Sequence, residues 1–132
     1  MTRAHEAGAL ILRLVLGFTF FMHGLAKFQM GLGNTAGFFE SLGIPGFLGY
    51  VVAIIELVGG LAMIVGMGTR IAAVLFVFVM LGAIFTAKLA AGFMGNGQMA
   101  GYELDLALLA MSVSLALTGS RWYSLASLFQ KK

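Results

Sequence analysis

The sequence contains no cysteine, one proline and few charged side chains. The absence of cysteine excludes disulfide bonds, thiolate metal sites, iron–sulfur clusters and Cys-x-x-Cys redox chemistry. Charged residues make up 10% of the 132 positions and hydrophobic residues 61%, whereas a soluble domain carries roughly a quarter charged and about half apolar residues. The mean hydropathy is +1.02. We therefore expect the chain to fold in a lipid bilayer.

Positive charge is also sparse, with a formal net charge of +3. No run of basic residues and no surface of interleaved basic and aromatic residues accompanies this charge, so nucleic-acid binding is excluded. In an integral membrane protein, Lys and Arg instead determine which way the chain is inserted.

Long apolar runs are the main feature of the sequence. A helix of about 20 apolar residues is long enough to cross a bilayer. The runs predict four spans, at about 9–30, 47–67, 71–91 and 102–118, with an interfacial helix at about 35–42. We expect a single domain over residues 1–132: an all-α integral membrane protein folded as a four-helix transmembrane bundle.

The distribution of basic residues predicts the orientation. Six of them fall on one side of the predicted bundle: Arg3, Arg13, Arg70, Arg121, Lys131 and Lys132. The other side has only Lys27 and Lys88. Because cytoplasmic segments retain Lys and Arg, both termini are predicted to be cytoplasmic, in a multi-pass protein of the cytoplasmic membrane.

Small residues recur at helical spacing in every predicted span. They permit the close helix contacts on which membrane bundles depend, so each stripe is expected to face a neighbouring helix. The stripes are Gly17, Gly24 and Gly31; Gly59, Ala62 and Gly66; Ala83, Ala87 and Ala91; and Ala107, Ala110, Ser114 and Thr118.

Five ionisable residues fall in the outer half of the predicted bundle or at its mouth: His23, Lys27, Glu56, Lys88 and Glu103. A charge near the bilayer centre costs at least about 2.5–3.5 kcal/mol, so such groups normally face one another or a wet cavity. We expect His23, Lys27, Glu56 and Glu103 to meet in one polar pocket in the outer half of the bundle. By the same interpretation, Glu103 faces inward with Ala107, and Asp105 faces headgroups or water.

Simpler interpretations stay open for several of these residues. Lys27, Lys88 and Glu103 lie within about a turn of a helix end and can reach water, and His23 alone can be a neutral packing residue. Arg13 either anchors the first helix to headgroups or pairs with another segment. Glu56 is different, because it lies eight or nine residues inside its span, too deep for a carboxylate to reach water.

In their order and spacing, several short motifs resemble the DoxX family of small bacterial membrane proteins. They are Arg13-Leu-Val-Leu-Gly17, His23-Gly24-Leu-Ala-Lys27-Phe28, Leu42-Gly43-Ile-Pro45, Glu56-Leu-Val-Gly59-Gly60, Gly66-x-x-Thr69-Arg70 and the late Glu103. The resemblance implies a four-helix membrane subunit. Related DoxD-type proteins form the membrane part of a thiosulfate:quinone oxidoreductase, and other members are associated with oxidative stress or with resistance to catechols and quinones.

The resemblance therefore implies quinone or quinol as the ligand of this chain. Reducing a quinone requires hydrogen bonds to its carbonyl oxygens and a supply of protons, for which His23, Lys27 and Glu56 are the candidate catalytic residues. The candidate substrate-binding residues are His23, Lys27, Glu56, Lys88 and Glu103.

Other redox cofactors find no site in the sequence. His5 lies eighteen residues from His23, about 27 Å along a helix, so the two cannot share a haem. No Gly-x-Gly-x-x-Gly turn and no Glu-x-x-His pair supports a flavin or di-iron site. Neither haem, flavin nor metal is expected, and electrons would come from the substrate or a soluble oxidoreductase partner.

Two other functions stay open. The chain can be a membrane anchor for a soluble redox enzyme, or a small oligomeric exporter of hydrophobic compounds. The six-to-two distribution of basic residues argues against an exporter that inserts both ways round. The first predicted span also lacks the acidic residue typical of such exporters. The substrate, the partner and oligomerisation are not determined by the sequence.

Overall fold

The computed structural model describes residues 2–88, 92–97 and 101–121. Its elements are α1 (Arg3–Met30), α2 (Leu32–Ser41), α3 (Phe47–Val65), α4 (Thr69–Ala83), the π-helical turn η1 (Ile84–Lys88) and α5 (Glu103–Thr118). No β-strand occurs in these three described ranges. The predicted all-α class is confirmed.

Three helical segments are long and apolar enough to cross a membrane: α1, α3, and α4 together with the start of η1, through Thr86. At 16 residues, α5 is about 24 Å long, less than a hydrocarbon core of about 30 Å. The predicted interfacial helix is present as α2, which begins three residues earlier than expected. The predicted end of the third span, residues 89–91, lies outside the described residues.

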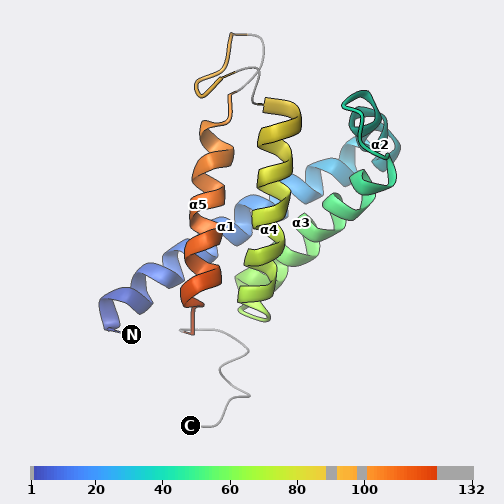
Figure 1. Ribbon diagram of the computed structural model, residues 1–132. Helices are drawn as coiled ribbons and strands as arrows, with labels where there is room; N and C mark the ends of the chain where they lie inside the picture. Colours follow the sequence, from blue (N-terminus) through green and yellow to red (C-terminus); the bar gives the residue numbers. More distant parts are fainter. Residues whose placement is uncertain (1, 89–91, 98–100, 122–132) are drawn as a thin grey trace.

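The helices form two antiparallel pairs that pack against each other (Figure 1). In one pair α1 lies along α3, and in the other α4 lies along α5. A stacked contact between Phe20 of α1 and Phe76 of α4, with ring centroids 3.8 Å apart, joins the pairs. The N-terminus, the α3–α4 turn and the end of α5 share one end of the molecule, and α2 and the segment before α5 share the other.

The contact between α1 and α3 depends on glycine. A Cβ atom on Gly24 would lie 2.4 Å from the Leu57 backbone nitrogen, and one on Gly17 would lie 2.9 Å from the Gly60 carbonyl oxygen. Because these neighbours are backbone atoms, no side chain can move aside. The prediction that the first helix packs through Gly17 and Gly24 is confirmed.

On α5 the small-residue prediction is wrong. Ala107 and Ala110 are exposed, and the buried residues are Asp105, Leu108, Ser112 and Leu115. These four recur at alternating spacings of three and four, so they form one helical face. On this helix Ala107 and Ala110 face outward, and the face that carries Leu108 and Leu115 meets the neighbouring helices.

Arg13 is buried, with 1% of its surface exposed. Its Nη1 donates a hydrogen bond to Ser120 Oγ at 3.4 Å. At the same end of the molecule, Arg70 Nη2 donates to the Leu117 carbonyl at 3.1 Å. Of the two interpretations of Arg13, pairing with another segment is therefore the one that the structure supports.

Candidate functional site

A partly buried ion pair joins the two helices that approach most closely. Lys27 Nζ of α1 lies 2.6 Å from Glu56 Oε1 of α3. Gly24 brings α1 against the backbone of α3 at Leu57, and Lys27, one turn further along α1, extends from that contact to the carboxylate. Only 2% of Glu56 is exposed.

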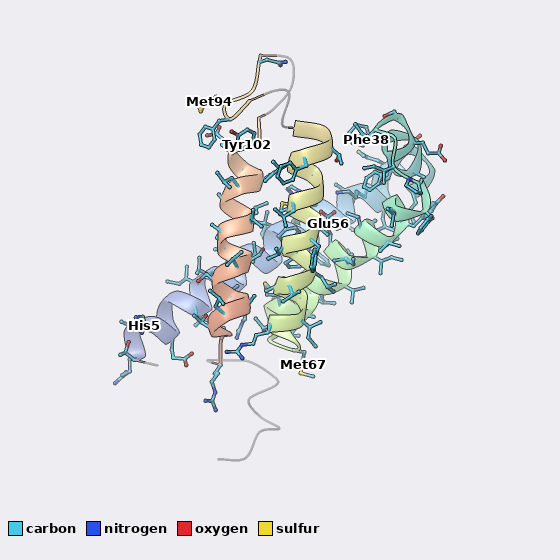
Figure 2. All side chains as sticks on the ribbon, in the orientation of Figure 1. His5, Phe38, Glu56, Met67, Met94 and Tyr102 are labelled. Atoms are coloured by element: carbon cyan, nitrogen blue, oxygen red, sulfur yellow. The ribbon has the colours of Figure 1, made fainter. Side chains whose placement is uncertain are left out.

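Glu56 is also central along the helix axis. It lies nine residues from each end of α3, which is about 14 Å from either end. In Figure 2 its label accordingly falls between the end that carries His5 and Met67 and the end that carries Met94 and Tyr102. A carboxylate this deep requires a partner, which Lys27 supplies.

The ion pair lines a cavity of about 700 Å³ between the end of α1, α2, the first half of α3, the second half of α4 and the start of α5. The polar residues of its lining are His23, Lys27, Asn34, Thr35, Glu56, Thr86 and Asp105. The rest of the lining is apolar. An apolar cavity with a few placed polar groups is typical of small-molecule sites.

The structure reverses the predicted roles of the two acids on α5. Asp105 is 6% exposed and lines the cavity, whereas Glu103 is exposed and does not belong to the lining. The prediction that Glu103 faces inward was wrong, because it followed the alanines rather than the larger buried residues. The spacing of Asp105 from Leu108 and Ser112 was the signal in the sequence that would have placed Asp105 inside.

Two predicted site residues remain, His23 and Lys88, and the structure describes the side chain of His23 only. His23 is partly buried, lines the cavity and, like Asp105, interacts electrostatically with Glu56. Lys88 ends η1, and its side chain lies outside the described part of the structure. The sequence interpretation missed Thr35 and Thr86, since neutral hydroxyls on apolar helices carry no distinctive pattern.

The part of the cavity around the Lys27–Glu56 ion pair offers both hydrogen-bond donors and hydrogen-bond acceptors. Lys27 donates, the two carboxylates accept, and the imidazole of His23 does either according to its protonation. Among residues 2–88, 92–97 and 101–121, no three His, Asp or Glu side chains are grouped as ligands of a metal ion. The arrangement can hold a small molecule that carries polar atoms on an apolar body.

Known proteins provide independent comparisons. The family model described as DoxX matches residues 8–89, a range that includes His23, Lys27 and Glu56. No solved structure shows significant similarity to the chain.

Three curated proteins are similar over most of their length. "Putative oxidoreductase CatD" of Bacillus subtilis (strain 168) is 50% identical over 125 residues, covering 95% of this chain and 89% of that protein. "Inner membrane protein YqjF" of Escherichia coli (strain K12) is 31% identical over 134 residues, covering 100% and 99%. "Uncharacterized membrane protein Rv3486" of Mycobacterium tuberculosis (strain ATCC 25618 / H37Rv) is 34% identical over 122 residues, covering 84% and 75%.

Proposed function

This chain belongs to the DoxX family, and from that premise we propose that its cavity binds the head group of a quinone or quinol inside the membrane. The observation that carries the proposal is the 2.6 Å Lys27–Glu56 ion pair in an otherwise mainly apolar cavity. One relative is named an oxidoreductase and another an inner membrane protein. The first name agrees with redox chemistry and the second with a location in a membrane.

The membrane arrangement that we propose is a four-helix transmembrane bundle with both termini in the cytoplasm. The three long apolar segments span the bilayer, and the shorter α5 spans it by local thinning of the bilayer. Support comes from the ends of the molecule, because the N-terminus, the α3–α4 turn and the end of α5 lie together in Figure 1. This shared end carries Arg3, Arg70 and Arg121, as a cytoplasmic face would.

Cysteine labelling tests this topology without background, since the chain has no native cysteine. Met94, 72% exposed, and Met67, 41% exposed, lie at opposite ends of the molecule (Figure 2). In intact cells, Met94→Cys should react with an impermeant thiol reagent. Met67→Cys should react only after the cells are permeabilised. The opposite pattern would reverse the proposed orientation.

The residues of the site suit both directions of quinone chemistry. Reduction of a quinone to its hydroquinone consumes two electrons and two protons, and oxidation releases them. In this proposal Lys27 and His23 donate hydrogen bonds to a carbonyl oxygen, and Glu56 and Asp105 exchange protons with a hydroxyl group. In this proposal the electrons come from a soluble oxidoreductase partner, and the chain supplies the membrane site.

A thermal-shift experiment tests the proposed ligand. Purified protein in lipid nanodiscs is heated with and without a benzoquinone that carries a decyl chain. A ligand present at 100 times its Kd stabilises the folded state by about 2.7 kcal/mol, so the melting temperature should rise by several degrees. A melting temperature that does not respond to the quinone would contradict the proposal.

Asp105 and Glu103 form a matched pair of acids, two residues apart on α5. Asp105→Asn should reduce the quinone-dependent stabilisation by about 1–2 kcal/mol, because it removes a charged hydrogen-bonding group from the cavity. Glu103→Gln should leave the shift unchanged, because Glu103 is exposed and outside the lining. Equal effects of the two substitutions would exclude Asp105 from the binding site.

A further inference from the structure

Exposed lining residues of the cavity reach the depth of the hydrocarbon core. Among its lining residues, Met22 is 42% exposed and Phe78 is 68% exposed. Phe78 lies nine residues from the start and eight from the end of the apolar segment Thr69–Thr86, so it is close to the middle of a span. An opening flanked by Phe78 therefore faces lipid chains rather than water.

One wall of the cavity, between the ion pair and the outer end of the molecule, is apolar. Along α3, Leu48 and Val52 precede Glu56 by two turns and one turn and line the same cavity. Phe39 of α2 and Ile44 complete this wall. On this wall an apolar stretch of about 12 Å, from Leu48 to Glu56, lies between the outer end and the ion pair. The polar lining residues of the outer half, Asn34, Thr35 and Thr86, belong to α2 and η1 instead.

Both observations favour a ligand that is already dissolved in the bilayer. We propose that the ligand enters sideways from the lipid through an opening between α4 and the α1–α2 side, and that it carries an aliphatic chain. The head group lies at the Lys27–Glu56 pair, and the chain leaves past Phe78 and Gly82 of α4 into the hydrocarbon. This inference rests on the proposed function and specifies its substrate class, a quinone with an aliphatic tail.

Gly82 provides a direct test of the opening. It lines the cavity, and a Cβ atom placed on it would meet nothing within 4 Å. Gly82→Leu therefore fills the opening without a clash with the fold. Gly8 of α1 has equally open surroundings and does not line the cavity, so Gly8→Leu is the matched control.

Phe78 and Phe85 provide a second pair of test positions, at which the substitution makes the side chain smaller instead of larger. They are 68% and 67% exposed, and only Phe78 lines the cavity. Phe78→Ala should weaken binding of the tailed quinone by about three- to tenfold through lost contact with the chain. Phe85→Ala should leave binding unchanged.

The experiment compares a decyl-benzoquinone with the same head group bearing only a methyl group, in nanodiscs. Both affinities are expressed per mole of lipid, which removes the difference in partitioning. The decyl compound should bind about three- to tenfold more tightly, because its chain makes van der Waals contacts with Phe78 at the opening that the methyl compound lacks. Gly82→Leu should abolish this advantage, and Gly8→Leu should preserve it.

Failure of this inference is distinguishable from failure of the proposed function. If both quinones bind equally, if Gly82→Leu has no effect and if Glu56→Gln weakens both, lateral entry is wrong and quinone binding stands. If neither quinone binds to the wild-type protein, the proposed function and the inference that rests on it are both overturned.

Discussion

Glu56→Gln should lower quinone-linked turnover by about 10²-fold or more, the usual loss when a group that transfers a proton is removed. Glutamine keeps the size of the side chain and much of its hydrogen bonding, but it cannot exchange a proton with the ligand. The measurement is the rate of quinone reduction by membranes that contain equal amounts of each variant. Melting temperatures show whether the variant is folded.

Two further measurements separate proton transfer from a structural role. Glu56→Asp retains an acid and should recover part of the rate, although the shorter side chain lengthens the 2.6 Å contact with Lys27. The pH profile of turnover should flatten in Glu56→Gln and keep its shape in Glu103→Gln, which alters an exposed acid. Full turnover in Glu56→Gln would show that the ion pair only stabilises the fold.

Gly24→Ala should destabilise the protein by about 3 kcal/mol, at the upper end of the range for overpacked positions. The added Cβ would lie 2.4 Å from the Leu57 backbone nitrogen and 2.8 Å from its Cα, so α1 and α3 have to move apart. Gly24→Leu should prevent the native packing altogether. The measurement is thermal or denaturant unfolding in detergent.

The control is again Gly8, whose surroundings are open. Gly8→Ala should be neutral or stabilise the protein by up to about 1 kcal/mol, because alanine has the higher helix propensity. Separation of α1 from α3 also draws Lys27 away from Glu56, so any folded Gly24→Ala protein should bind quinone more weakly. Equal stability of the two variants would mean that α1 and α3 do not rely on this contact.

Much of the fold could be predicted because its signals lie within single segments of the sequence. The length of an apolar run reflects the thickness of the bilayer, and the spacing of glycines within a helix marks its packing face. Hydrophobic length defined α1 and α3 to within a few residues of the ends predicted for them, apart from the first turns of α1. Gly17 and Gly24 marked the face of α1 that meets α3. The same reasoning failed on α5, where the rule that small residues face inward competed with the burial of Leu108 and Leu115.

The candidate site was only partly visible in the sequence. The depth of Glu56 showed that it required a partner, and the fold brings Lys27 to it, 29 positions away. No local rule connects Arg13 with Ser120, since 107 positions separate them. The predicted single domain and the roles assigned to His23, Lys27 and Glu56 stay predictions until the experiments above are done.

Two cations of α1, Arg13 and Lys27, bind partners on other segments and oppose sliding of α1 along its own axis. Arg13 and Lys27 are fourteen residues apart, close to four helical turns, so they project from nearly the same side of the helix about 21 Å apart. Arg13 meets Ser120 near one end of the bundle, and Lys27 meets Glu56 at its centre. Sliding α1 by one turn, about 5.4 Å, would remove both cations from their partners at once. The two contacts therefore oppose a piston movement of α1, and we expect the cavity to widen through α2 and α4, whose exposed Phe38 and Phe78 belong to its lining.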